Sequence, residues 1–261
     1  MKIAVFGGSF DPVHIAHKKV VQAALKNLDI DKIIIVPTYL NPLKKDFLFN
    51  PKTRFELLKK VFSNDKKVEI SDFEINQKKL SYTYETIRYI KKLYKPIKIY
   101  FIIGEDNLKS LHKWHNIEEL KNNLEFIVAK RVGYEVENIE FKTLDIDINI
   151  NISSTKLREK LDLNLIPKEI WEDLENLTKR KTLNKRTENI KAILEDKKAV
   201  DIEIFDLTSK EYLVDYVVIA TTLNPKHASA LLDYLKIDLK PSGEEFLRVD
   251  EDDNWTVIDL G

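Results

Sequence analysis

Residues 2–17 read KIAVFGGSFDPVHIAH, an apolar strand pattern that leads directly into two glycines and then into two histidines. Gly7 and Gly8 are two of only six glycines in the 261 residues, and adjacent glycines allow a sharp turn and a close approach of the backbone to a ligand. A helix is expected over His17–Asn27, and a helix N-terminus attracts anions through its free N–H groups and its dipole. The stretch therefore predicts a phosphate-binding strand–turn–helix unit with His14 and His17 as donors.

Two alternatives stay open for this histidine pair. A spacing of three residues also suits zinc, although the sequence offers no third ligand of suitable type nearby. The two rings could equally form a buried structural pair.

Outward from this unit, short runs rich in Ile and Val alternate with helical patterns up to about residue 176. Apolar strands separated by helices are typical of a parallel sheet covered on both faces, so an α/β, Rossmann-like fold is predicted. Alternation of Ile with Asp and Asn over Ile146–Ile152 suggests one more strand. The other strands are expected at Lys2–Phe6, Lys32–Pro37, Val68–Ile70, Ile97–Ile103 and Glu125–Lys130, and the other helices at Pro51–Phe62, Thr83–Tyr94 and Ser154–Leu161.

A second motif, ISSTKLR, occupies residues 152–158, where a strand passes into a helix. Its hydroxyls could simply cap the helix start. Arg158, however, lies one turn on from Ser154, so hydroxyls, N–H groups and a guanidinium converge in a way that suits a triphosphate.

Together the two motifs resemble the nucleotidylyltransferase superfamily, with its HxGH and ISSTxxR signatures. Within it, residues 1–177 are similar to the nicotinate-mononucleotide adenylyltransferases. The added matches are SYT at 81–83 followed by Thr86, Gly104 and Asp106 with Trp114 downstream, and VAKRVGY at 128–134. Two positions depart from the family pattern: Ala16 replaces the glycine of HxGH, and Leu43 replaces the histidine of PPHK.

The resemblance implies transfer of AMP from ATP to nicotinate mononucleotide, giving deamido-NAD and pyrophosphate. It also implies site residues. His14, His17 and Arg158 are expected to be catalytic, with His17 as the transition-state donor. The expected ATP-binding set is Gly7, Gly8, Ser9, Phe10, His14, His17, Gly104, Asp106, Ile152, Ser153, Ser154 and Arg158. The expected nicotinate mononucleotide set is Asn41, Lys44, Thr83 and Trp114.

Several of these residues have an ordinary alternative. Trp114 could pack in the interior, and Asp106 could cap a helix. Arg54 and Arg131 are expected to form ion pairs or to lie at the rim, and His112 and His115 to be neighbours of Trp114. Mg²⁺ is expected on the ATP phosphates, held largely by water and phosphate oxygens, with no metal site made by the protein itself.

Composition limits the other possibilities. The chain has no cysteine, which excludes a disulfide scaffold, a thiol nucleophile and a cysteine-ligated metal. It shows neither a signal peptide nor an apolar run of the roughly 18 residues that span a bilayer, so a cytoplasmic protein without a membrane partner is expected. The net charge of zero is a cancellation: residues 1–184 carry 33 basic and 26 acidic groups, and residues 185–261 carry 10 and 17.

The change of sign marks a second domain. Residues 178–186 form a polar, basic stretch that is expected to be a linker, or the end of one helix running into the next. After it, residues 187–261 predict a small α+β domain. Its helices are expected at Thr187–Asp196 and Pro225–Leu235, and its strands at Asp201–Asp206, Tyr216–Thr222, Phe246–Val249 and Trp255–Leu260.

This second domain resembles the ribosomal silencing factor (Iojap-like) family in ILEDKKAVDI at 193–202, DYVVIAT at 215–221 and WTVIDLG at 255–261. The resemblance implies binding to a protein of the large ribosomal subunit, with Trp255 as an interface residue or, alternatively, a core residue. An acidic surface disfavours direct contact with nucleic acid. Because the family continues with another strand after this point, the domain is expected to be incomplete.

Two kinds of function therefore stand together, an adenylyltransferase and a ribosome-binding module. The alternatives are a related nucleotidyltransferase with another phosphate acceptor, such as phosphopantetheine or a small alcohol phosphate, and a chain whose main role is non-enzymatic binding to the ribosome.

Overall fold

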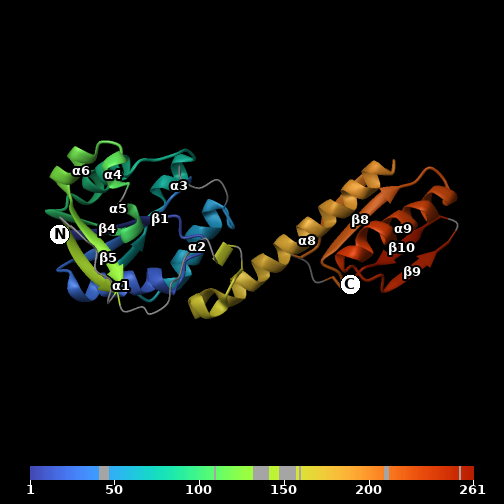
Figure 1. Cartoon of the computed structure of the whole chain (residues 1–261), viewed down its shortest axis with the longest axis horizontal. Coiled ribbons are helices and arrows are strands. Elements are labelled where there is room, and N and C mark those ends of the chain that lie inside the picture. The colour runs from blue at the N-terminus through green and yellow to red at the C-terminus, as the bar shows by residue number, and fades with distance from the viewer. Residues whose placement is uncertain are drawn as a thin grey trace. The chain divides into compact units, whose positions relative to one another are not determined.

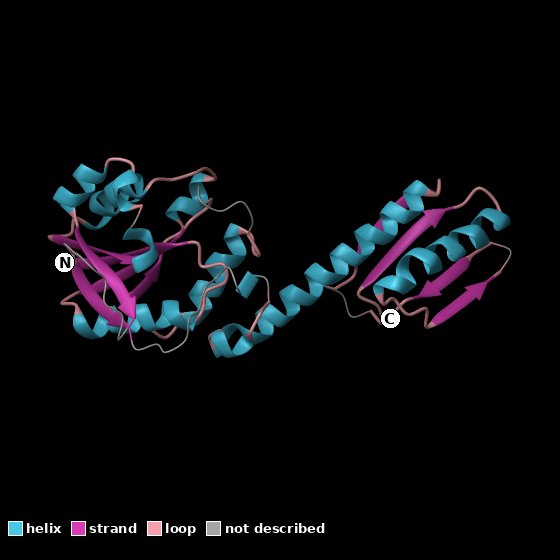
Figure 2. Ribbon diagram, viewed as in Figure 1, coloured by secondary structure: helices cyan, strands magenta, loops and turns pink. Residues whose placement is uncertain are grey.

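A computed structural model of the chain describes residues 1–40, 47–108, 110–131, 141–146, 157–158, 160–208, 212–252 and 254–261. The chain folds as two compact units, residues 1–173 and 174–261. Figure 1 shows the elements of each unit, and Figure 2 separates helices from strands.

The first unit is built on a six-stranded parallel sheet with the order β3-β2-β1-β4-β5-β6. The order reverses direction between β1 and β4, and in open α/β sheets the ligand binds at such a point, beyond the carboxyl ends of the strands. Gly8 ends β1 and Gly104 ends β4, so both lie at this edge. The strands are β1 (Lys2–Gly8), β2 (Lys32–Pro37), β3 (Val68–Ile70), β4 (Lys98–Gly104), β5 (Glu125–Arg131) and β6 (Lys142–Ile146).

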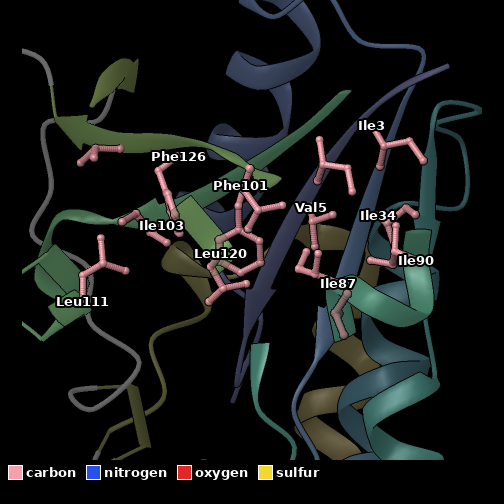
Figure 3. Close-up of a cluster of buried hydrophobic side chains, with 14 residues drawn as sticks. Ile3, Val5, Ile34, Ile87, Ile90, Phe101, Ile103, Leu111, Leu120 and Phe126 are labelled. Carbon is pink, nitrogen blue, oxygen red and sulfur yellow. The ribbon is translucent and has the colours of Figure 1, made fainter. Parts of the chain in front are cut away.

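Helices cover both faces of this sheet (Figure 1). On one face, Ile3, Val5 and Phe101 pack against α4 and α6 in a buried cluster (Figure 3). Ala4 and Phe6 are also buried, and because successive strand residues point to opposite faces, they face the other layer. The helices are α1 (Ile15–Asn27), α2 (Pro51–Val61), α3 (Phe73–Gln77), α4 (Thr83–Tyr94), α5 (Glu105–Leu108) and α6 (Ile117–Asn123).

The predicted Rossmann-like fold is confirmed, and the first five strands lie within three residues of their expected bounds. The short helices α3, α5 and α6 were not predicted. Of the strand expected at Ile146–Ile152, residues 147–152 lie outside the described residues, and β6 ends at Ile146, where it was expected to begin. The helix expected at Ser154–Leu161 is described only at residues 157–158, which are helical, and 160–161.

The second unit contains α8 (Trp171–Asp196), which begins before residue 174, and α9 (Pro225–Leu239). Two antiparallel pairs accompany them, β7 (Val200–Asp206) with β8 (Tyr216–Thr221), and β9 (Arg248–Glu251) with β10 (Thr256–Asp259). The buried side chains come mostly from the two helices: Ile190, Leu194, Ala199, Leu231, Leu235 and Leu239. The predicted α+β class of this region is therefore confirmed.

Residues 178–186 are helical and lie inside α8, so the basic stretch is not an irregular linker but the alternative, one helix running into the next. Arg186 shows why this part is ordered. Its guanidinium donates to the carbonyl oxygens of Leu260 and Gly261, which follow β10, and pairs with Glu244, so the stretch is fixed within its own unit. In the parts of the chain that are described, no helix has the length and apolar character needed to cross a membrane.

Candidate active site at the end of the first strand

Of the two adjacent glycines, Gly8 is needed for space rather than for backbone freedom. Gly7 and Gly8 both belong to β1, and the residue with positive φ is Phe10, at 48°. A Cβ at Gly8 would lie 3.2 Å from two ring atoms of Phe10, whereas one at Gly7 would meet its nearest atom, on Phe101, at an ordinary 3.6 Å. The expectation that these glycines make the turn is therefore wrong: Gly8 instead leaves room for the Phe10 ring.

That ring forms one wall beside the histidines. Phe10 is 2% exposed, and its ring lies edge-on to Phe6, with centroids 5.3 Å apart, and to His17, with centroids 4.9 Å apart. Packing of this kind fixes the His17 ring plane without using either of its nitrogens.

His14 and His17 stand together at the start of α1. His14 is the N-cap residue, and the two rings stack with their centroids 3.7 Å apart and their planes at 21°. The backbone N–H of His14 donates to Nδ1 of His17 over 3.2 Å. A ring nitrogen that accepts a hydrogen bond carries no proton, so the neutral His17 ring holds its proton on Nε2, where it can be donated. Among the described residues, no group of three His, Asp or Glu is arranged to hold a metal ion.

The loop after β1 is fixed from two sides through Asp11, which is fully buried. Its carboxylate accepts from the backbone N–H groups of Leu48, at 2.7 Å, and Phe49, at 2.9 Å. Its carbonyl oxygen lies 3.5 Å from Nη1 of Arg158, a residue 147 positions further along the chain. The structure thus brings the arginine of the second motif to the loop of the first.

Arg54 differs from its expected role as an ion-pair or rim residue. It is fully buried in α2, and its guanidinium donates to four backbone carbonyls. Burial lowers the pKa of Arg54, and the nearby Asp11 carboxylate opposes that change. One feature of the sequence could have drawn attention to Arg54, because it is one of only seven arginines in a lysine-rich chain.

Thr83 and Trp114 were both expected to bind nicotinate mononucleotide, and in the structure their sequence neighbours are in contact. Thr83 begins α4, and the preceding Tyr82 stacks on His115, with ring centroids 4.8 Å apart, which joins the start of α4 to the segment of Trp114. Trp114 is half-buried and lies edge-on to Phe101 and Phe126 of the core. Trp114 therefore packs partly in the interior and stays partly accessible, and its stacking on a pyridine ring stays a prediction.

A buried carboxyl group near these residues was not predicted. Glu74 of α3 is 6% exposed, and its Oε1 accepts from the Thr86 hydroxyl over 2.6 Å. Burial raises the pKa of Glu74 to about 7. The short helix α3 gives no periodic pattern from which the sequence could have revealed this group.

Several expected site residues lie outside the described residues, namely Asn41, Lys44, Ile152, Ser153 and Ser154. Asp106 lies in α5 directly after β4, but its side chain is not among those described. Trp255, in the second unit, comes just before β10 and is 65% exposed, so it is not a core residue.

Three features occur together: the order of the strands, the edge of the sheet beside β1 and β4 where a ligand is expected, and the His14–His17 pair close to the distant Arg158. Together they define the class of nucleotidylyltransferases. The model of the cytidylyltransferase-like family matches residues 5–160. A protein of Aliarcobacter butzleri named as a probable nicotinate-nucleotide adenylyltransferase is 60% identical over 182 residues, covering 69% of this chain and 99% of that protein. A protein of the same name from Campylobacter fetus is 46% identical over 181 residues, covering 69% and 98%.

A solved structure of an enzyme of this kind is also similar to the chain. Nicotinic acid mononucleotide adenylyltransferase of Plasmodium falciparum, complexed with NaAD, is 25% identical, with a TM-score of 0.51, and the match covers 62% of this chain and 87% of that one. The chain belongs to the cytidylyltransferase-like family and, by its N-terminal 69%, to the nicotinate-nucleotide adenylyltransferases within it. Residues 180–261 match a second model, ribosomal silencing factor during starvation.

Proposed function

We propose that the chain transfers AMP from ATP to nicotinate mononucleotide. An oxygen of the mononucleotide phosphate attacks the α-phosphorus, the bond to the bridging oxygen of the β-phosphate breaks, and pyrophosphate leaves as deamido-NAD forms. The observation that carries this proposal is the convergence of the His14–His17 pair and Arg158 on the loop after β1. The substrate supplies the nucleophile, so the protein needs only to position two anions and stabilise charge.

The proposed roles combine the placement of the described residues with the resemblance of the motifs. The backbone from Gly7 to Phe10 approaches ATP, His14 and His17 bind its phosphates, and the Nε2 proton of His17 stabilises the charge that develops in the transition state. Arg158, with the hydroxyls of Ser153 and Ser154 and the adjoining Ile152, holds the β- and γ-phosphates. Gly104 and Asp106 are assigned to the ATP ribose. On the acceptor side, Trp114 stacks on the pyridine, Thr83 offers a backbone N–H to the carboxylate, and Asn41 and Lys44 are assigned to the same substrate.

We treat the metal as part of the substrate, MgATP. The described residues hold no cluster of three carboxylates or imidazoles, and the donors nearest the loop after β1 are cationic or N–H groups. Such donors suit phosphate oxygens rather than Mg²⁺ itself, which keeps several waters and binds chiefly through phosphates.

The acceptor is tested by a panel. Purified full-length chain is assayed with MgATP and nicotinate mononucleotide, nicotinamide mononucleotide, phosphopantetheine or glycerol phosphate, and with CTP in place of ATP. We expect turnover with nicotinate mononucleotide and ATP to exceed every other pair. Equal efficiency with nicotinamide mononucleotide removes the nicotinate assignment, and preference for another phosphate acceptor replaces it.

We further propose that residues 187–261 bind a protein of the large ribosomal subunit, with residues 1–177 as the enzyme and 178–186 as the connecting part of α8. The match to the silencing-factor model supports this, as do the exposed side chains of Trp255, Leu213 and Val257 and an acidic charge suited to a basic partner. Large exposed apolar side chains on a unit this small favour a protein partner.

Sedimentation with purified large subunits tests this second function. Full-length chain is expected to co-sediment, Trp255→Ala to bind at least tenfold more weakly, and His17→Asn, which changes only the enzyme, to bind as the wild type does. A full-length chain that stays in the supernatant contradicts the proposal, whereas binding without any adenylyl transfer would favour a purely non-enzymatic role.

A further inference from the structure

We propose that Arg54 is a positioning residue for adenylyl transfer, because its buried guanidinium locks the loop after β1 to both flanks of the segment between β2 and α2. This inference rests on the function proposed above. Arg54 lies in the first turns of α2, whose start is fixed by the Asn50 side chain accepting from the N–H of Thr53 over 2.9 Å. The base of the Arg54 side chain is therefore held by a capped helix.

Three separate segments meet at this guanidinium. Nη1 donates to the carbonyl of Ser9, in the loop after β1, over 2.6 Å. Nη2 donates to the carbonyls of Thr38, at 2.7 Å, and Tyr39, at 3.2 Å, just past the end of β2. Nε donates to the carbonyl of Phe49, at 3.2 Å, shortly before α2.

Asp11 completes the connection from the opposite direction. While Arg54 takes the carbonyl of Phe49, the Asp11 carboxylate takes the N–H groups of Phe49 and Leu48. The loop that contains Ser9 and Asp11 is thus joined to residues 48–49 by one cationic and one anionic side chain, both fully buried.

Only arginine suits this arrangement. Its planar guanidinium presents five N–H donors in fixed directions, whereas a lysine ammonium offers three donors at one point and cannot reach four carbonyls spread over three segments. Burying a cation is costly and would be avoided if packing alone were required. The arrangement therefore points to geometry rather than stability as the reason for the charge.

The geometry matters because the joined segments adjoin, along the sequence, residues that are proposed for both substrates. The loop after β1 leads into the His14–His17 pair and lies beside Arg158, and residues 38–39 and 48–49 flank Asn41 and Lys44. Arg54 therefore sets the position of the loop after β1 relative to the segment between β2 and α2. Displacing reacting groups by about 1 Å can cost about 100-fold in rate.

Arg54→Lys tests the proposal, with Leu58→Ala as the matched control. Leu58 is fully buried one turn further along the same helix, and its side chain cannot form a hydrogen bond, so its truncation lowers stability and removes no hydrogen bond to either loop. We expect Arg54→Lys to lose at least tenfold in kcat and to raise KM at least threefold for both ATP and nicotinate mononucleotide. Leu58→Ala, assayed well below its melting temperature, should keep all three constants within twofold of the wild type.

The outcomes separate cleanly. A wild-type chain with no turnover overturns the proposed function itself. A wild type that turns over, together with a folded Arg54→Lys whose kcat and both KM values stay within twofold, overturns only the positioning role. If Arg54→Lys does not fold, Arg54→Gln is measured in the same way, and failure of both variants to fold assigns Arg54 to stability alone and also overturns the proposal.

Discussion

The backbone N–H of His14 donates to Nδ1 of His17, and the two rings stack with centroids 3.7 Å apart. The hydrogen bond assigns the His17 proton to Nε2, and the stack holds both rings at the start of α1. One imidazole thus serves two purposes through its two nitrogens, since Nδ1 helps to close the helix start while Nε2 presents a proton.

Two substitutions separate these purposes. The Oδ1 of His17→Asn can accept the His14 N–H but the side chain cannot reach as far as Nε2, whereas His17→Gln places an N–H₂ group near Nε2 and gives up the Nδ1 acceptor. We expect kcat for adenylyl transfer to fall about 100-fold or more in His17→Asn, the scale of losing one preorganised donor, and less in His17→Gln. Both variants should keep the wild-type circular dichroism. A His17→Asn enzyme as fast as the wild type would contradict the donor role.

The two glycines of β1 should respond differently to alanine. A methyl at Gly8 would press on the Phe10 ring at 3.2 Å, and that ring packs on His17, so we expect Gly8→Ala to lower kcat/KM for ATP about tenfold or more. Gly7→Ala meets only an ordinary contact at 3.6 Å and should stay within about threefold. Equal effects in the two variants, measured by initial rates, would show that Phe10 does not transmit the change.

Trp114 should act on one substrate only. Its ring edge packs on Phe101 and Phe126, while its partial exposure leaves it accessible to a pyridine ring. We expect Trp114→Ala to raise KM for nicotinate mononucleotide about fivefold and Trp114→Phe to raise it less, since aromatic stacking contributes about 1 kcal/mol. The KM for ATP serves as the internal control. A rise confined to ATP would exclude the stacking role.

The sequence predicted features that depend on residues adjacent in the chain, and it did not predict features that depend on contacts between distant segments. Runs such as Ile33–Val36 predicted strands because fully buried parallel strands tolerate only apolar residues, and the strand-to-helix unit was recognisable because its glycines and histidines are adjacent in the chain. The role of Arg54 could not be predicted, since it depends on carbonyls from three segments that only the fold brings together. Arg186, in the helical residues 178–186, likewise contacts Leu260 and Gly261, some 75 residues away, and the sequence does not reveal contacts of this kind.

Glu74 should make stability depend on pH. Its pKa is raised to about 7 from an ordinary 4.5, so the folded chain keeps a proton that the unfolded chain releases. The free energy of unfolding therefore falls as pH rises from about 4.5 to about 7 and is constant above that range, a loss of at most about 3 kcal/mol. Glu74→Gln cannot ionise and can still accept from Thr86. Its melting temperature relative to the wild type should thus be several degrees more favourable at pH 8 than at pH 5.

An exposed carboxyl elsewhere in the first unit supplies the control for this pH effect. Glu119→Gln changes an exposed carboxyl on α6 and should shift the melting temperature equally at both pH values. If Glu74→Gln behaves in the same way, with no dependence on pH, then the buried carboxyl does not titrate in this range.

In the proposed reaction, the mononucleotide phosphate attacks the α-phosphorus of ATP at the His14–His17 site. Full-length chain is incubated with nicotinate mononucleotide and ATP labelled with ³²P at either the α or the γ position, and the products are separated. We expect the α label to enter deamido-NAD and the γ label to enter pyrophosphate, with formation of both products about 100-fold slower in His17→Asn. Label from the γ position in the mononucleotide product, or dinucleotide formation unchanged in His17→Asn, would contradict this expectation.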